Sequence, residues 1–299
     1  MNNMFDRWMN NTLHIENLRI DELILPGSHD SGYDKKAPNA FLPQEITQDV
    51  SPQEQVAAGV RVLDLRVEFY SSKPVGRAHR FQIFHMTSSG RTVSVDILDM
   101  VNDFYDTPST KSARAREIFI LDFHEFKNFT PQAHQELCEL INSKIGYRSI
   151  SKDLRHLTLD QLWNQHPGKT VVIAYNHFTQ NSDFWPGVEQ KWSGDNVMTT
   201  QQLKAFMDEV ATQYKPSYVL RSIQCAKYVL PFFVPDDFSN KIDTWFESND
   251  ENSYIQKFFI INTDWTTRSR IVLNCLHANQ FRGRQKNTHN DTQASFSGE

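Results

Sequence analysis

Short apolar runs recur along the chain and alternate with segments that have the periodicity of amphipathic helices. The runs are rich in β-branched and aromatic residues, which is typical of strands. They predict strands at residues 22–26, 61–69, 81–85, 118–123, 170–175, 218–223 and 258–263. The intervening segments predict helices at residues 51–58, 95–105, 131–145, 158–164, 200–214 and 269–280.

Alternating strands and helices predict a parallel sheet with crossover helices, and therefore the α/β class. We favour a closed TIM-type (β/α) barrel over an open doubly wound sheet, because no glycine-rich nucleotide loop follows a predicted strand. A chain of 299 residues suits a single domain of this kind. We place the barrel at residues 1–282 and interpret the polar residues 283–299 as a flexible tail. The pattern shows seven strands, and the eighth is not visible.

The composition argues against several classes of function. The net charge is −5 with acidic and basic residues mixed along the chain, so a nucleic-acid partner is not expected. The three cysteines are widely separated, which fits neither a disulfide framework nor a zinc site. No apolar run approaches the roughly 20 residues of a membrane span, and the first residues lack the apolar stretch of a signal peptide.

Residues with acid–base chemistry follow several of the predicted strands. His29 and Asp30 lie in LILPGSHDSG, Asp64 and Arg66 in GVRVLDLRVEF, and His85 in FQIFHMTSSG. In a barrel the carboxyl ends of the strands meet at one face, so these side chains are expected to gather there. A histidine takes and returns protons near neutral pH, and an arginine fork holds phosphoryl oxygens by paired hydrogen bonds. The grouping therefore predicts acid–base chemistry on a phosphate.

The segments LPGSHDSG, GVRVLDLR, IFH and INTDW resemble the catalytic X region of phosphatidylinositol-specific phospholipases C, over residues 20–90 and 258–266. The order is similar to that of the bacterial single-domain enzymes and the X-domain-only proteins, with some features of calcium-dependent members. The resemblance implies a distorted α/β barrel that cleaves phosphatidylinositol to diacylglycerol and inositol 1,2-cyclic phosphate. It also implies a membrane phosphoinositide or inositol glycolipid as substrate, peripheral contact with the membrane surface, a monomer, and secretion, with a cytoplasmic location as the alternative.

Matching motif positions imply a role for each residue of the central set. His29 corresponds to the general base for the inositol 2-hydroxyl, and His85 to the general acid for the diacylglycerol oxygen. Arg66 corresponds to the cation that holds the non-bridging phosphate oxygens. The chemistry is physically reasonable, because a neighbouring hydroxyl is a nucleophile at high effective concentration and no covalent side-chain nucleophile is required.

Three carboxylates complete this set. The resemblance implies that Asp264 orients His29, that Asp30 supports His85, and that Asp64 tunes the phosphate end of the site. Structural roles stay open for the same residues. Asp64 can form an ion pair with the neighbouring arginine inside the barrel, Asp264 can cap a helix after INTDWT, and the histidine of IFH can be a core residue.

The run ILDFHEF departs from the bacterial pattern, which has a lysine near the end of this strand. Arg66 favours a site without metal because its guanidinium fills the place of the cation, whereas clustered carboxylates favour a bound ion. Both interpretations stay open, and the expected calcium ligands are Asp30, Asp64 and Glu125. No organic cofactor is expected.

Positions at other strand ends suggest substrate contacts. His124, Tyr175, Asn176 and Trp192 are candidates for binding the inositol ring by their location alone. The apolar loop at residues 228–233 resembles a rim segment that dips into lipid headgroups. Two rival functions are a glycerophosphodiesterase or sphingomyelinase D-like barrel, and an inactive phosphoinositide-binding barrel.

Overall fold

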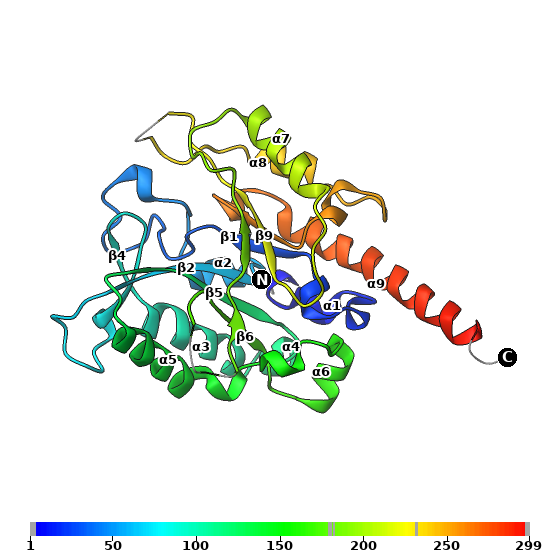
Figure 1. Ribbon diagram of the computed structural model, residues 1–299, viewed down its shortest axis with the longest axis horizontal. Coiled ribbons are helices and arrows are strands. Elements are labelled where there is room, and N and C mark those ends of the chain that lie inside the picture. The colour runs from blue at the N-terminus through cyan, green and yellow to red at the C-terminus, as the bar shows by residue number, and fades with distance from the viewer. Residues whose placement is uncertain (1–3, 179–180, 182, 231–232, 297–299) are drawn as a thin grey trace.

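The computed structural model describes residues 4–178, 181, 183–230 and 233–296. A curled parallel sheet forms its centre, and helices surround the sheet (Figure 1). The parallel strands are β1 (Leu25–Ser28), β2 (Val62–Phe69), β5 (Phe119–Lys127), β6 (Val171–Tyr175), β7 (Trp185–Pro186), β8 (Glu189–Lys191), β9 (Arg221–Cys225) and β10 (Ile260–Thr263). Their order across the sheet is β7-β6-β5-β2-β1-β10-β9-β8. The antiparallel strands β3 (Phe81–Phe84) and β4 (Ser88–Thr92) extend from β2.

The two ends of the sheet meet at one short stretch of chain. β7 pairs with β6, and β8 pairs with β9, yet only residues 187–188 separate β7 from β8. The same segment therefore lies against both ends of the sheet and closes the curl. This confirms the predicted distorted α/β barrel. The predicted strand at 81–85 is the antiparallel β3, which lies outside the parallel sheet, so six of the predicted strands are parallel ones. The other parallel strands, β7 and β8, are too short to produce an alternating pattern.

Helices cover the outside of the sheet and the ends of the barrel. They are α1 (Trp8–Asn11), α2 (Pro52–Ala57), α3 (Met100–Asp106), α4 (Lys111–Arg114), α5 (Pro131–Ile145), α6 (Leu159–Gln165), α7 (Thr200–Ala211), α8 (Ser239–Trp245) and α9 (Ile271–Phe296). A π-helix (Val93–Asp99) leads into α3. Ser51 and Thr130 cap α2 and α5 through their side chains, with proline at the first helical position, as their sequences indicate.

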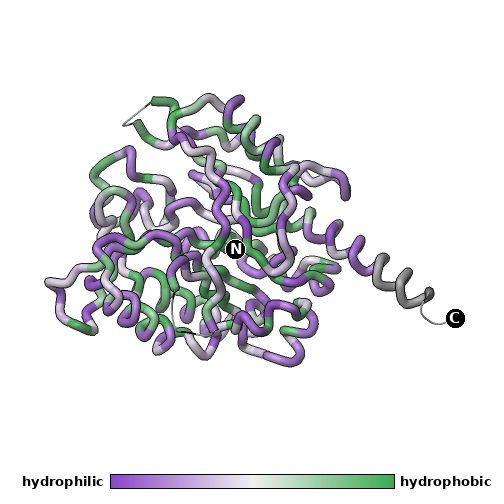
Figure 2. Tube along the Cα trace, viewed as in Figure 1, coloured by the Kyte–Doolittle hydropathy of each residue, from purple (hydrophilic) through white to green (hydrophobic). Residues whose placement is uncertain are grey.

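The C-terminal segment differs from its prediction. Residues 283–296, which we interpreted as a flexible tail, continue helix α9. The helix is held by a distant part of the chain, since Asn17 donates a hydrogen bond to the carbonyl oxygen of Gly283 at 3.2 Å and Lys286 pairs with Glu22. Beyond these contacts α9 projects from the body (Figure 1), and its coloured part near the body alternates between hydrophilic and hydrophobic residues (Figure 2). The polar composition of this segment predicts a coil. The prediction misses the helix because the residues that hold it are distant in the sequence.

Alternation along β2 separates core residues from site residues. Leu63, Leu65 and Val67 pack in a buried cluster with the apolar faces of α3 and α5. Asp64 and Arg66 occupy the intervening positions and therefore face the other side of the sheet, toward the barrel mouth. Among the residues that the structure describes, no helix is both long and apolar enough to span a membrane.

Candidate active site

The pairing of β1 with β10 brings His29 and Asp264 together. Ser28 and Thr263 are partners at the ends of these parallel strands, and the two site residues follow them directly. His29 Nδ1 lies 2.7 Å from Asp264 Oδ1. Asp30 and Trp265, the next residue on each side, adopt positive φ angles of 46° and 50°, which turn both chains away from the sheet at this point. The structure thus joins two residues that are 235 positions apart in the sequence.

Arg66 defines the protonation pattern of His29. Its Nη2 lies 2.8 Å from His29 Nε2. A guanidinium has only donors, so this contact requires Nε2 to accept and places the imidazole proton on Nδ1, facing Asp264. Burial disfavours the imidazolium, but the Asp264 carboxylate outweighs it and raises the pKa of His29 above its ordinary value. In this tautomer the lone pair of His29 Nε2 points toward Arg66 at the barrel mouth.

Three carboxylates surround the same guanidinium. Arg66 Nε lies 3.1 Å from Asp30 Oδ1, Nη2 lies 3.8 Å from Asp64 Oδ2, and Nη1 lies 3.6 Å from Glu125 Oε2. Burial opposes the charge, but these carboxylates raise the pKa of Arg66 above its ordinary value. They are the residues that we expected to bind calcium. The donor set does not fit a calcium ion well, because an arginine already occupies its centre and supplies the positive charge.

His85 follows β3 and has a different environment. Its Nδ1 lies 3.2 Å from the carbonyl oxygen of Glu45, and its Nε2 lies 3.5 Å from Asp30 Oδ2. Both ring nitrogens therefore face acceptors, an arrangement that suits the protonated imidazolium. The ring centroids of His29 and His85 are 6.3 Å apart and their planes meet at 81°. The two rings flank one space at the barrel mouth.

A β-bulge in β5 turns two consecutive side chains toward this space. Leu65 pairs with Phe123, but the next residue, Arg66, pairs with Glu125, so His124 is the extra residue. His124 and Glu125 both line the cavity as a result. The sequence pattern places Glu125 near the site, but simple alternation would turn it to the opposite face from His124. The bulge is the feature that the sequence does not reveal.

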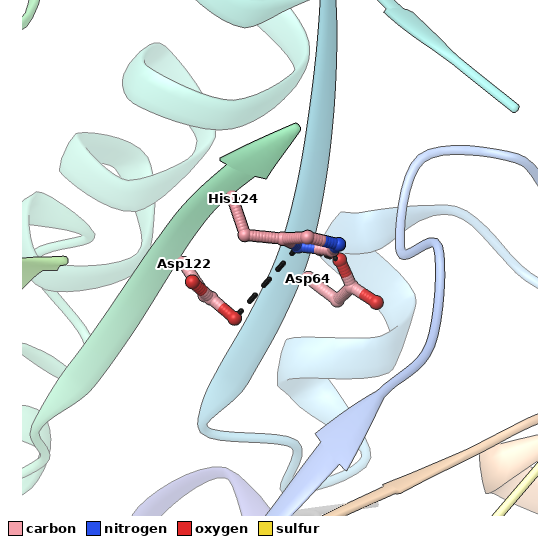
Figure 3. Close-up of side chains that lie close together, drawn as sticks. All are labelled: Asp64, Asp122 and His124. Atoms are coloured by element: carbon pink, nitrogen blue, oxygen red, sulfur yellow. Dashed lines mark ion pairs between the residues drawn. The ribbon is translucent and has the colours of Figure 1, made fainter. Parts of the chain in front are cut away.

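Asp64, Asp122 and His124 lie close together, the two carboxylates buried and the histidine partly buried (Figure 3). His124 Nδ1 lies 2.7 Å from Asp64 Oδ1 and 3.9 Å from Asp122 Oδ2. Although burial opposes its charge, Asp64 raises the pKa of His124 to about 9. Burial raises the pKa of Asp122 to about 7. One ligand atom from each residue lies within 4.8 Å of the others, which is the spacing of a possible cation site. The Asp64–His124 ion pair already balances charge within it.

The side chains around Arg66 open into a cavity of about 380 Å³. The cavity is lined by His29, Arg66, His85, His124, Glu125, Gln190, Trp192, Asn196, Gln224, Ala226, Lys227 and Tyr228. His124 and Trp192 are thus positioned to contact a substrate. The sequence does not point to Gln190 and Gln224 as site residues, because amide side chains on short strands belong to no recognisable motif. They are joined by a hydrogen bond, and Gln190 also donates to Asp122 Oδ2 at 2.6 Å.

Two predicted substrate contacts lie elsewhere. Tyr175 is buried on the helix-facing side of β6, where its ring centroid lies 4.8 Å from that of Phe126 and its hydroxyl bonds His134 Nδ1 at 2.9 Å. Asn176 is exposed, and its side chain donates to the carbonyl oxygen of His124 at 3.0 Å. Neither residue lines the cavity. The prediction from location was wrong because strand alternation turns Tyr175 outward.

The predicted rim loop lies next to the cavity. Its first residue, Tyr228, lines the cavity and donates a hydrogen bond to the carbonyl oxygen of Gln44 at 2.7 Å. Val229, Leu230 and Phe233 expose more than half of their surface. Residues 231–232, which include Phe232, lie outside the described residues. The described part of the loop presents apolar side chains to solvent.

Known proteins with similar sequences and folds exist. No family model matches the chain. It is 24% identical to human PI-PLC X domain-containing protein 2 over 223 residues, which are 67% of this chain and 70% of that protein. It is 25% identical to human PI-PLC X domain-containing protein 1 over 224 residues, 66% of this chain and 65% of that protein. These similarities support the resemblance to PI-PLC X-domain proteins that the sequence motifs indicate.

The match to the mouse PI-PLC X domain-containing protein 2, at 24% identity, spans 68% of this chain but only 63% of that protein. Solved bacterial structures show the same fold. The phosphatidylinositol-specific phospholipase C of Listeria monocytogenes superimposes with a TM-score of 0.67 at 17% identity, over 93% of this chain and 98% of that one. A mutant of the Staphylococcus aureus enzyme gives 0.66 at 13% identity, over 93% and 99%. This chain therefore has the same barrel fold as these bacterial structures.

Proposed function

We propose that the protein cleaves phosphatidylinositol, or a glycolipid that contains it, to diacylglycerol and inositol 1,2-cyclic phosphate. One observation carries the proposal: the two histidines of the site have opposite hydrogen-bond environments. His29 faces a carboxylate on one side and a guanidinium on the other, which suits a neutral base. His85 faces acceptors on both sides, which suits a charged acid. A phosphodiester bound between them meets one group that takes a proton and one that gives it.

In the first step, His29 Nε2 accepts the proton of the inositol 2-hydroxyl. The hydroxyl oxygen forms a bond to phosphorus, the bond from phosphorus to the diacylglycerol oxygen breaks, and His85 Nε2 delivers its proton to that oxygen. Arg66 holds the non-bridging oxygens, where negative charge develops. Asp264 stabilises the imidazolium that forms on His29. The exchanged roles of the two histidines then allow water to open the cyclic phosphate.

Asp30 links the acid to the phosphate-binding cation. Its Oδ2 lies 3.5 Å from His85 Nε2, and its Oδ1 lies 3.1 Å from Arg66 Nε. The carboxylate is fully buried, so these contacts are poorly screened by solvent. Asp30 therefore orients both groups with one side chain. We expect it to maintain the charged form of His85 until the leaving oxygen takes the proton.

We further propose that the reaction uses Arg66 in place of calcium. The carboxylates of Asp30, Asp64 and Glu125 all contact its guanidinium, so the counter-charge that clustered carboxylates need is already present. A guanidinium also has donors in the fork geometry that matches two phosphoryl oxygens. The Asp64–Asp122–His124 cluster fits a cation by spacing, but no step of the proposed reaction requires one there.

We also propose that the exposed rim side chains Val229, Leu230 and Phe233 contact the membrane surface. They follow Tyr228, which lines the cavity, so the rim would sit against the lipid from which the headgroup is taken. Burying such apolar side chains in the headgroup region is favourable by roughly 25 cal/mol for each Å² removed from water. Peripheral contact of this kind needs no spanning helix.

The proposal is tested by product analysis. The purified protein is incubated with phosphatidylinositol vesicles, and water-soluble phosphorus is followed by 31P NMR. We expect inositol 1,2-cyclic phosphate from the wild type, and a rate lower by at least about 100-fold in His29→Ala and in His85→Ala. The matched control is His134→Ala, because His134 is a partly buried histidine stacked on His177 outside the cavity.

The other products identify the rival functions. In parallel incubations, glycerol phosphate released from a glycerophosphodiester, or a ceramide phosphate formed in the lipid phase of sphingomyelin vesicles, would indicate the glycerophosphodiesterase or sphingomyelinase D-like barrel. Vesicle binding without any phosphorus-containing product would indicate an inactive phosphoinositide-binding barrel. Either outcome refutes the proposed reaction.

A further inference from the structure

One segment between β1 and α2 contacts the loops that carry the proposed catalytic residues. This segment, residues 44–48, begins within the short 3-10 helix Pro43–Glu45. Its backbone and side-chain contacts reach the chain after β1, β3, β9 and β10. They join Gln44 O to Tyr228, Glu45 O to His85, Thr47 Oγ1 to Asp30 O, and Thr47 O to Trp265 N. The segment is thus a strap across four strand ends.

Gln48 ends the strap and uses its whole amide. Its Nε2 donates to the carbonyl oxygens of His29 and Thr263, each at 2.9 Å. Its Oε1 accepts from the backbone nitrogen of Thr266 at 3.2 Å. The side chain is buried, with 1% of its surface exposed, so water does not compete for these bonds. One amide therefore bridges His29 and two residues close to Asp264 in the sequence, Thr263 and Thr266.

The bridge lies where the sheet stops holding the two chains. The β1–β10 ladder ends at the Ser28–Thr263 pair, followed by a last backbone bond from His29 N to Thr263 O at 3.1 Å. Beyond it both chains turn through residues with positive φ. The separation of the two loops at this point depends on the groups that span them.

We propose that Gln48 is a positioning residue that sets the distance between His29 and Asp264. The inference rests on the proposed function and deepens it, because it names the residue that holds the base against its carboxylate. Gln48 does not touch the ring of His29 or the carboxylate of Asp264. It acts through the two backbone carbonyl oxygens to which it donates.

Titration of His29 reports this distance. The charged groups facing the ring are Asp264 from the end of β10, Arg66 from β2 and Asp30 from its own loop, with the ring of His85 at 6.3 Å. Gln48 is uncharged, so replacing it changes none of these groups. A change in the pKa of His29 in a Gln48 variant therefore reports altered geometry.

The test compares the pKa of His29, measured by NMR titration of its ring carbon signals, in the wild type and in Gln48→Ala. We expect the pKa to fall by about one unit, because a longer Asp264 contact stabilises the imidazolium less, and kcat to fall about tenfold at unchanged KM. Gln48→Met fills the same volume without donor or acceptor, and provides the measurement if the alanine variant does not fold. An unchanged pKa in a folded variant overturns the inference.

Asn279→Ala is the matched control. Asn279 is a fully buried amide at the other end of β1, where its Oδ1 accepts from Ile24 N at 3.0 Å and its Nδ2 donates to Ile24 O at 2.7 Å. We expect it to lower the melting temperature as much as Gln48→Ala does, without moving the pKa of His29 or kcat. If the wild type does not cleave phosphatidylinositol, the proposed function fails, while the titration still decides the role of Gln48.

Discussion

Replacing Asp264 by asparagine removes one charge from the proposed base without changing its shape. In the wild type, Asp264 Oδ1 lies 2.7 Å from His29 Nδ1 and raises the pKa of His29 against the effect of burial. During the reaction His29 becomes an imidazolium, so the carboxylate stabilises the transition state more than the ground state. Asp264→Asn should therefore lower kcat.

The size of the effect follows from the distance. Two unit charges about 4 Å apart interact by about 4 kcal/mol at an effective dielectric constant of 20. The asparagine keeps a neutral hydrogen bond, which offsets about 1 kcal/mol of this loss. We expect a net loss of about 2–4 kcal/mol, which is a factor of roughly 30 to 1,000 in kcat.

The pH profile separates this role from a structural one. The base works when unprotonated, so activity falls as the pH drops through its pKa. Removing the carboxylate lowers that pKa, and the acidic limb of kcat/KM should move to lower pH while the plateau falls. The control is Asp243→Asn, because the Asp243 carboxylate accepts from Arg270 N near the start of α9 and lies away from the cavity. An unchanged plateau, or a limb displaced to higher pH, would refute the reasoning.

Three further variants or conditions test the rest of the site. Arg66→Lys should lower kcat by roughly 10- to 100-fold with little change in melting temperature, because a lysine ammonium cannot form the paired hydrogen bonds of the guanidinium. Wild-type kinetics in this variant would contradict the proposed phosphate contact. Excess chelator should leave the initial rate on phosphatidylinositol unchanged, since Arg66 supplies the cation; loss of activity that calcium restores would show that it does not. Leu230→Ala combined with Phe233→Ala should reduce the fraction of protein that sediments with phosphatidylinositol vesicles, while hydrolysis of soluble inositol 1,2-cyclic phosphate stays unchanged. The control is Tyr214→Ala, which removes an exposed tyrosine outside the cavity lining and should leave sedimentation unchanged. Equal vesicle binding by the double variant and the control would argue against the rim contact.

The strands and the residues at their ends were predictable because both depend on local pattern. Alternation in GVRVLDLRVEF places Asp64 and Arg66 on one face, and the structure finds them there. The barrel rule then brings residues from distant segments to one face, and His29 and Asp264 are indeed in contact. Helix α5 was predicted with the bounds that it has, since Thr130 and the following proline define its start.

Features that depend on pairing between strands were not predictable. The bulge at His124 arises from the register of β5 against β2, and no residue type signals it. Gln190 reaches the cavity on a three-residue strand that has no alternating pattern. Gln48 looks like an ordinary polar loop residue in QEITQDV, yet it is buried because four loops converge on its segment. In each case tertiary contacts, rather than local propensity, define the role.

Charge balance in the cavity links the acid to the phosphate site. Asp64 is matched by His124 at 2.7 Å, and Asp30 is matched by Arg66 at 3.1 Å, so these four groups contribute little net charge. A bound phosphodiester adds one negative charge and draws Arg66 toward its oxygens, which leaves Asp30 without part of its partner. A protonated His85, 3.5 Å from Asp30, restores the balance on arrival of the substrate. In the proposed mechanism the buried Asp30 carboxylate therefore connects the phosphate-binding guanidinium with the ring of His85, because it contacts both groups.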